Sequence, residues 1–392
     1  MRLHFLKNPF YLYIIAFATV IGLYLLRWSD LFPKLSTGLL LFFILTFIFS
    51  LICGKLFSYL RKPLFSANFF NKNDPIIVFG IFFCYALEFL YVGHVPLFTL
   101  SPSAKFMHFG GIPTFHVFLV TFTVFYSVVL FHKLISCFSK KNLLYFFLIL
   151  IPPLLMVNRG MFIEIFFAAL IVYIFSIQRL FFKKIIYVSI IVIGVFYGFA
   201  LLGNARLQSD TTFHDKIAVP SERFKKNRIP DTFLWPYMYA TSPLGNLQKA
   251  IDVAKPAYDF KAFFFLCICP DFISKRIYQH SNKLIGPRIA VSFTVSTMYY
   301  NAYLTMGYVG MVLLFTYQII LLFLIPLSLK TRNKYYVPVM SITCVTVILN
   351  TFTNMWFFSA ISFPIFWGIL AGLRENKKIN RRKNDSYCVG QL

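Results

Sequence analysis

The sequence predicts an all-α polytopic membrane protein with about ten transmembrane helices, and three observations lead to this fold class. Hydrophobic residues make up 59% of the 392-residue chain. Charged residues make up 13% of it, against about 25% in soluble domains. The apolar residues also gather into long runs, and a helix needs about 20 of them to cross a bilayer. This composition excludes a soluble enzyme and a disordered chain.

The apolar runs define the predicted spans. These are residues 10–26, 37–54, 75–92, 114–136, 143–157, 161–178, 185–203, 308–328, 336–353 and 355–373. The first run has the basic flank of a signal peptide, but no small-residue cleavage site follows it. We therefore expect an uncleaved first span.

The distribution of Lys and Arg predicts how these spans are oriented. The chain has 38 Lys and Arg residues against 13 Asp and Glu residues, a net charge of +25. With both termini in the cytoplasm, more than half of the cations fall in cytoplasmic segments, as the positive-inside rule requires. The same orientation places one long segment, residues 204–307, on the periplasmic side.

This topology divides the chain into four predicted regions. They are a seven-helix transmembrane region (1–203), a large periplasmic loop with interfacial helices (204–307), three transmembrane helices (308–373) and a basic cytoplasmic tail (374–392). Within the loop, the apolar segment 263–269 is too short to span and is predicted to be interfacial or re-entrant. Residues 289–306 are long enough to cross but carry polar side chains. If both segments crossed, the chain would have twelve spans with the same ends; we favour ten.

Ionisable residues gather near the predicted outer ends of the spans. Glu88 lies close to the end of the third span, and Arg159 lies in a tight turn after the short fifth span. Glu164 follows in the first turn of the next helix, and Arg206 comes just after the seventh span. Charges at membrane depth are costly, so they are functional candidates by default.

The large loop carries more basic than acidic residues, and the run from Arg223 to Arg228 is its densest basic patch. An outward basic surface beside the membrane suits an anionic ligand such as a phosphate or pyrophosphate. Arginine is the better bidentate clamp for such a group. A helix beginning near Gly160 would add free backbone N–H groups beside Arg159.

Each of these features also has a simpler interpretation. Arg159 pairs with Glu164 or extends to the lipid headgroups. Glu88 is a structural carboxylate bonded between helices. The basic run is a solvated face attracted to anionic lipid. Histidines in outer loops are most often satisfied surface groups.

Several motifs that carry other chemistries are absent from the sequence. There is no His-Glu-x-x-His motif, no Cys/His cluster, no P-loop and no Gly-rich nucleotide fingerprint. We therefore expect neither a metal nor a cofactor. Nucleic acid is not an expected partner either, because the large basic segment faces away from the cytoplasm.

Short motifs in a fixed order give the chain a family resemblance. Glu88-Phe-Leu-Tyr-Val-Gly-His94-Val-Pro, followed by Phe109-Gly-Gly-Ile-Pro-Thr-Phe-His116, resembles the third-to-fourth-span region of bacterial Wzy-type polymerases of O-antigen and oligosaccharide repeat units. The turn 158–160 and the segments 203–206, 237–247 and 301–310 are similar to later parts of that family. The Arg-x10-Gly loop signature of some members is missing, because position 217 is Ile.

The resemblance implies a reaction. Such polymerases transfer a growing glycan from undecaprenyl pyrophosphate onto a lipid-linked repeat unit, at the periplasmic face of the inner membrane. They need no nucleotide, and a chain-length regulator protein is an implied partner. The substrates are undecaprenyl-pyrophosphate-linked oligosaccharides held in membrane lipid.

For this reaction we assign roles to the ionisable residues. Arg159 and Arg206 are expected to stabilise the departing pyrophosphate, and Glu88 is the first choice for the base that activates the acceptor hydroxyl. These three are the expected catalytic residues. The expected substrate-binding residues, which include weaker candidates for the base, are Arg223, Arg228, His94, His116, Asp210 and Arg288.

Other envelope functions stay open as alternatives. An O-antigen ligase uses the same donor but transfers to the lipid A core, and a membrane O-acyltransferase belongs to the same class of envelope enzymes. A flippase or transporter for lipid-linked oligosaccharides fits the length and the span count. The concentration of charge on one side argues against a transporter, which favours repeated halves and a polar path at the midplane.

Overall fold

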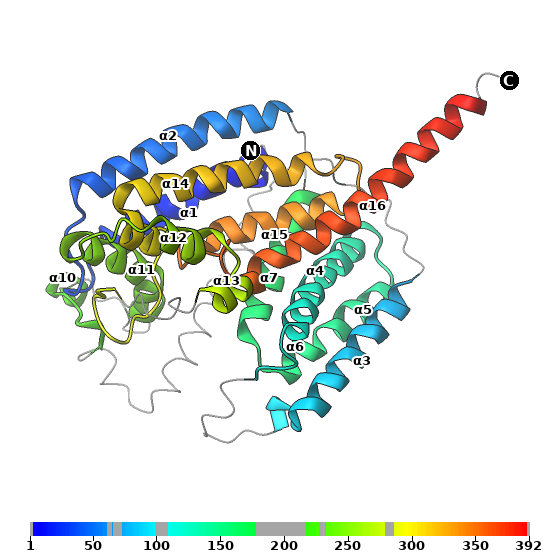
Figure 1. The fold of residues 1–392 in the computed structure, drawn as a ribbon, viewed down its shortest axis with the longest axis horizontal. Coiled ribbons are helices and arrows are strands. Elements are labelled where there is room, and N and C mark those ends of the chain that lie inside the picture. Colours follow the sequence, from blue (N-terminus) through cyan, green and yellow to red (C-terminus); the bar gives the residue numbers. More distant parts are fainter. Residues whose placement is uncertain are drawn as a thin grey trace. The chain divides into compact units, whose positions relative to one another are not determined.

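A computed structural model describes residues 3–60, 65, 73–98, 109–177, 217–226, 230, 233–278 and 286–389 (Figure 1). Over these ranges the chain is helical and forms no β-strand, since the bridge between Ser29 and Pro220 is isolated. The all-α prediction is confirmed.

The helices follow the apolar runs of the sequence. Helices lie at nine of the ten predicted spans, and the seventh, 185–203, lies outside the described residues. The elements are η1 (Leu3–Lys7), α1 (Pro9–Tyr24), α2 (Thr37–Leu60), α3 (Asp74–Val92), η2 (Pro96–Phe98), α4 (Phe115–Ser136), α5 (Lys140–Ile149), α6 (Ile151–Leu155), α7 (Arg159–Ser176), α10 (Glu222–Lys226), α11 (Leu234–Val253), α12 (Phe260–Phe263), the π-helical turn η6 (Phe264–Ile268), α13 (Asp271–Ile277), α14 (Tyr299–Leu327), α15 (Tyr336–Leu349) and α16 (Ser359–Val389).

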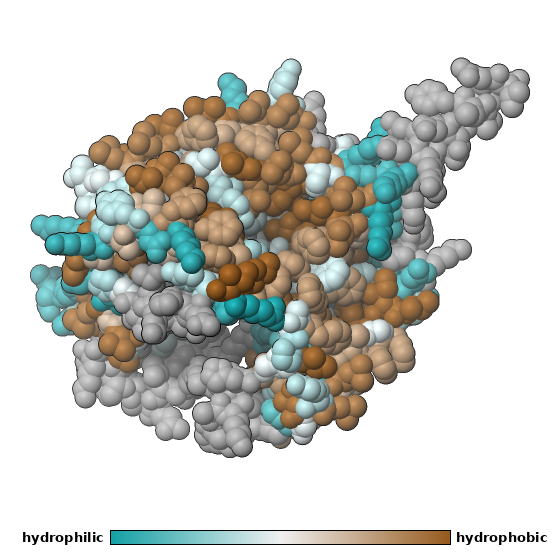
Figure 2. Space-filling view, in the orientation of Figure 1, coloured by the Kyte–Doolittle hydropathy of each residue, from teal (hydrophilic) through white to brown (hydrophobic). Residues whose placement is uncertain are grey.

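Four of the described helices, α2, α3, α4 and α14, are long and apolar enough to cross a membrane. Their outward side chains are apolar as well; on α2, for example, Leu45 is 65% exposed and Ile52 is 61% exposed. Figure 2 shows apolar surface along α2 and α14. A face of this kind is stable against lipid and unfavourable against water. These features support a helical membrane protein, while the number and direction of the spans stay predictions.

The chain folds into two compact units, each made of three separate segments. Unit 1 contains Met1–Leu56, Arg179–Ile319 and Val347–Phe357, and unit 2 contains Phe57–Gln178, Ile320–Thr346 and Phe358–Leu392. The two units are described separately below.

The core of unit 1 joins α1, α2 and α14 through buried aromatic side chains. The Tyr13 hydroxyl lies 2.7 Å from the Tyr299 hydroxyl and donates a hydrogen bond to Thr46 at 3.1 Å. All three side chains are buried, so these polar groups satisfy one another inside an apolar core. The phenols therefore fix how α1, α2 and α14 meet.

Residues predicted to form an outer loop add a buried helix to unit 1. Helix α11 contacts α1, and its Asn246 side chain is fully buried. Asn246 accepts a hydrogen bond from the Ile289 amide at 2.9 Å and donates to the Phe293 and Val295 carbonyls, both at 2.8 Å. One asparagine thus holds the segment that precedes α14 onto α11.

Helix α14 is broken at Gly307, where φ is 61° and ψ is −150°. The break leaves carbonyl groups of the preceding turn without their usual helical donors. The Ala257 amide donates to the Leu304 carbonyl at 2.9 Å, and the Asp259 amide donates to the Thr305 carbonyl at 3.0 Å. The segment before α12 therefore satisfies the carbonyls that the break exposes, as burial requires.

In unit 2, helices α3 and α4 run antiparallel. Near the start of α3, the buried Asp74 carboxylate forms an ion pair with Lys133 at the end of α4 and accepts a hydrogen bond from Tyr126 at 2.8 Å. Helix α16 also lies against α4, where the Trp367 indole N–H donates to Thr121 at 3.0 Å. The Asp74–Lys133 pair fixes one end of the α3–α4 register.

Substitution of Gly310 by Ala should destabilise the protein by about 1–3 kcal/mol, because overpacking of a close backbone contact costs this much. A Cβ at Gly310 would lie 2.2 Å from the Ala302 carbonyl oxygen. Thermal unfolding in detergent measures the effect. Gly22→Ala is the control, since a Cβ there meets nothing within 4 Å. Equal stability of the Gly310 and Gly22 variants would contradict the described break.

The Asp74→Asn substitution should cost about 3–5 kcal/mol, because it removes the carboxylate that forms an ion pair with the buried Lys133 ammonium. Denaturant unfolding of the purified protein measures the loss. The control is Glu222→Gln, which breaks the exposed pair with Lys225 and should change stability little. A loss no greater than that of the control would mean that the Asp74 pair is not buried as described.

Candidate functional site

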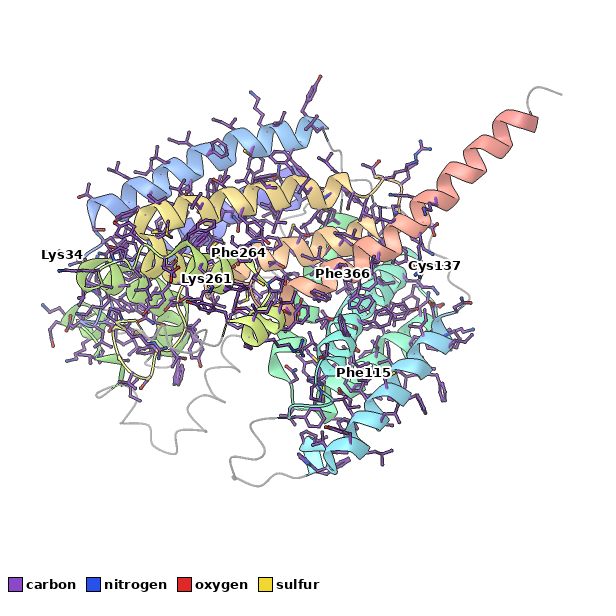
Figure 3. The ribbon with its side chains drawn as sticks, in the orientation of Figure 1. Lys34, Phe115, Cys137, Lys261, Phe264 and Phe366 are labelled. Atoms are coloured by element: carbon purple, nitrogen blue, oxygen red, sulfur yellow. The ribbon has the colours of Figure 1, made fainter. Side chains whose placement is uncertain are left out.

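The candidate site lies where the end of α3 meets the start of α4, within unit 2. Helix α3 ends at Val92 and is capped by Gly93, which has a φ of 80° and whose amide donates to the Phe89 carbonyl at 2.9 Å. Helix α4 begins at Phe115, which is labelled in Figure 3. Thr114, just before it, has a φ of 73°, a conformation that L-residues seldom adopt.

Glu88 and His116 form a hydrogen-bonded pair across these two helix ends. The Glu88 carboxylate Oε2 lies 2.8 Å from His116 Nδ1. The other oxygen, Oε1, accepts a hydrogen bond from the Ile112 amide at 3.4 Å. The Glu88 side chain is 0% exposed, whereas the His116 side chain is 19% exposed. The pair therefore combines a fully buried acid with a histidine side chain that stays partly exposed.

Gly111 closes the loop around this pair. Its φ of 55° lies in the left-handed region, which favours glycine. A Cβ at this position would lie 2.6 Å from His116 Nδ1 and 2.7 Å from Glu88 Oε1. The backbone approaches the pair too closely for any other residue, so the glycine is a requirement of the site.

An aromatic cluster surrounds the imidazole. The Phe109 ring lies 5.5 Å from the His116 ring in an edge-to-face arrangement, 5.7 Å from the Phe89 ring and 6.2 Å from the His94 ring. The structure thus brings His94 to the site, but no hydrogen bond joins it to Glu88 or His116 among the described residues. Phe109 shields the pair and limits the movement of the His116 ring.

Such an arrangement can perform acid–base chemistry. A carboxylate bonded to one imidazole nitrogen orients the ring and leaves the other nitrogen to exchange a proton. The pair lies at the end of two apolar helices, which is the depth of lipid headgroups if these helices span a bilayer. Its chemistry would therefore act on groups at the membrane surface.

Arg288, a predicted substrate-binding residue, belongs to unit 1. Its neighbours hold it on both sides, because the Tyr300 hydroxyl donates to the Pro287 carbonyl at 2.9 Å and the Ile289 amide donates to Asn246 at 2.9 Å. Among the described residues, the buried Nε atom has no hydrogen-bond acceptor and no acid pairs with the guanidinium. An arginine without an acidic partner among the described residues is suited to an anionic ligand.

Arg223 is exposed on the short helix α10, also in unit 1. The buried Phe224 anchors this helix, and its ring lies 5.4 Å from that of Trp28. The neighbouring Lys225 pairs with Glu222 at 3.0 Å in the open. Arg223 is therefore a solvated surface cation, as the simpler interpretation of the basic run expects.

Arg159 is the first residue of α7, so the helix predicted to begin near Gly160 is present. The Asn158 side chain caps it by accepting a hydrogen bond from the Met161 amide at 3.2 Å. The side chain of Arg159 is outside the described part of the structure, as are Arg206, Asp210 and Arg228. The roles assigned to these four residues stay predictions.

Glu164 is 1% exposed on α7, and among the described residues no donor reaches its Oε1. The pairing of Arg159 with Glu164 stays a prediction, because the Arg159 side chain lies outside the described part of the structure. Phe89, Phe109 and Gly111 were not assigned to the site from the sequence. The signal that could have identified them is the Gly110-Gly111 pair, which follows Phe109 and precedes the start of α4 by a few residues.

The described residues contain no group of three or more His, Cys, Asp or Glu side chains that could hold a metal ion. No protein-family model, no curated protein and no solved structure matches the chain.

Gly111→Ala should lower the free energy of unfolding by about 1–3 kcal/mol, because the added methyl group would overlap the Glu88–His116 pair. Gly110→Ala is the matched control, since a Cβ at Gly110 meets nothing within 4 Å. Both variants are compared by thermal unfolding in the same detergent. If the two neighbours behaved alike, the close approach at Gly111 would be wrong.

Proposed function

We propose that the protein is a membrane glycosyltransferase of the polysaccharide-polymerase type. It transfers a glycan chain from undecaprenyl pyrophosphate onto a lipid-linked repeat unit, at the periplasmic face of the inner membrane. The observation that carries this proposal is the buried Glu88–His116 pair at the ends of two apolar helices. An acid–base pair at that depth is suited to substrates whose reacting groups are held at the membrane surface by a lipid anchor.

The predicted orientation supports this side of the membrane. The positive-inside rule places the ends of α3 and α4 that carry Glu88 and His116 outside, and the ends that carry Asp74 and Lys133 inside. Lipid-pyrophosphate-linked glycans are extended on the outer side. The charge pattern and the acid–base pair therefore favour the same face.

The reaction needs two kinds of group, and the chain offers both. The acceptor hydroxyl needs a base, which the Glu88–His116 pair provides. The departing pyrophosphate needs positive charge or N–H donors. Arg159, at the capped start of α7 in the same unit, is the first candidate for that role, with Arg206 as the second. The donor is already activated, so no nucleotide is required.

The remaining predicted residues are assigned to substrate binding. Arg288 is the best supported of them, because the backbone on both sides of it is hydrogen-bonded and its guanidinium has no acidic partner among the described residues. Arg223 and Arg228 would attract anionic lipid or substrate, and Asp210 stays a weaker candidate for the base. A chain-length regulator is the proposed protein partner.

Arg159→Ala should abolish long glycan chains while the protein still inserts, because the leaving pyrophosphate loses its counter-charge. The test is the glycan banding pattern of cells in which the chromosomal gene is replaced by the variant, together with its amount in the membrane. A normal ladder from well-expressed Arg159→Ala would overturn the assignment.

The same banding pattern separates the proposed function from its alternatives. Loss of a polymerase leaves single repeat units attached to core, whereas loss of a ligase leaves polymer on the lipid carrier. Loss of a flippase leaves no periplasmic lipid-linked repeat units at all. Deletion of the gene therefore identifies the class, whatever the outcome for Arg159.

A further inference from the structure

We propose that His116 is the group that takes the acceptor proton, at Nε2, and that Glu88 is a positioning residue that acts through the imidazole. The inference rests on the proposed glycosyl transfer. It reverses the order expected from the sequence, in which Glu88 is the first choice for the base and His116 a weaker one.

Burial excludes Glu88 from direct contact with a substrate. Its side chain has no exposed surface, and both carboxylate oxygens are already engaged, one by His116 and the other by the Ile112 amide. A sugar hydroxyl could reach Glu88 only if the ends of α3 and α4 separated. His116 needs no such movement, because 19% of its side chain is exposed.

The hydrogen bond between the two residues decides which nitrogen of His116 can act. An ionised carboxylate accepts hydrogen bonds but donates none, so the proton of the neutral ring is on Nδ1. Nε2 then carries the lone pair, and none of the described residues donates a hydrogen bond to it. When Nε2 takes up a proton, the carboxylate stabilises the imidazolium that results.

The surroundings of the pair preserve this arrangement. The Gly111 backbone lies so close to the pair that a Cβ there would collide with both side chains, and the Phe109 ring packs edge-to-face with the imidazole. A ring held in one orientation presents Nε2 in a fixed direction, which a base needs for efficient proton transfer.

The second charged pair of the same two helices provides a comparison. Asp74 and Lys133 are both largely buried, with 3% and 11% of their side chains exposed, and Tyr126 adds a further bond. That pair has the features of a structural ion pair. The Glu88–His116 pair differs in two ways. His116 is more exposed than Lys133, and its Nε2 has no hydrogen-bond partner among the described residues.

The proposed step balances without a further reactant. His116 Nε2 takes the proton of the acceptor hydroxyl as that oxygen forms its bond to the anomeric carbon of the donor glycan. The bond between the anomeric carbon and the pyrophosphate oxygen breaks, and its electron pair leaves with the undecaprenyl pyrophosphate. The proton then passes from Nε2 to solvent, which returns the pair to its starting state.

One test needs no substrate. Long-range proton–nitrogen NMR of protein labelled with 15N-histidine reports which nitrogen of each of the seven histidines carries the proton. His116→Asn identifies the His116 signal by its absence. We expect the Nδ1-protonated form in the wild type and loss of that preference in Glu88→Gln. A neutral His116 protonated on Nε2 in the wild type would overturn the proposal, whatever reaction the protein catalyses.

The second test measures the reaction on the lipid-linked oligosaccharide fraction extracted from a strain that lacks the gene. Purified protein in proteoliposomes should convert it to longer glycan and free undecaprenyl pyrophosphate. His116→Asn and Glu88→Gln should each lower kcat by about 10²–10⁴-fold, the range for a general base, with KM little changed. Glu88→Asp should retain more activity than Glu88→Gln.

Rescue distinguishes chemistry from folding. Imidazole should restore activity to His116→Gly at least tenfold but should not restore it to Glu88→Gln, which keeps its ring. Gly110→Ala is the control with unchanged activity. If wild-type protein makes no product, the proposed function fails. If wild type is active and stable His116→Asn is equally active, or imidazole does not rescue His116→Gly, only the assignment of His116 is overturned.

Discussion

The packing of unit 2 depends on two buried carboxylates, because each needs a partner inside the protein. Helix α3 carries Asp74 near one end and Glu88 near the other, about 21 Å apart at 1.5 Å per residue, and both are buried. Each is stable only because α4 supplies a basic partner, Lys133 for Asp74 and His116 for Glu88. Two pairs fix the register of two helices at both ends. A slip of α4 by one turn would leave both acids without partners, so the geometry of the candidate site and the packing of the helices have one cause.

In the described part of unit 1 the buried polar side chains are neutral, and many of them form hydrogen bonds with one another or with the backbone. Its core uses phenols, hydroxyls and one asparagine, and the break in α14 is satisfied by two backbone amides from a distant segment. Neutral hydrogen bonds of this kind hold an apolar core in one arrangement without burying charge. The units therefore differ in chemistry: unit 2 buries ionisable groups, and the described part of unit 1 presents its arginines at or near the surface.

The sequence predicts the helices well, because runs of apolar residues about 20 long have few alternatives. It also identifies Glu88 and His116 as candidates, since charge at membrane depth is rare. The sequence could not show which of the two is the base. That choice depends on which side chain is buried, and that is decided by the loop that carries Phe109 and Gly111, not by residues adjacent to either. Nor could the sequence show that Asn246 fastens a distant segment to α11, or that Gly307 interrupts a helix, because both depend on partners more than 40 residues away.

The break in α14 has a consequence for the order in which the protein is made. Ala257 and Asp259, whose amides satisfy the freed carbonyls of Leu304 and Thr305, come earlier in the chain than α14 itself. During synthesis, which proceeds from the N-terminus, their segment leaves the ribosome before the helix it completes. The carbonyls that the break exposes can therefore find their donors as soon as the helix forms. The donors that complete the broken helix are therefore already part of the chain when α14 is made.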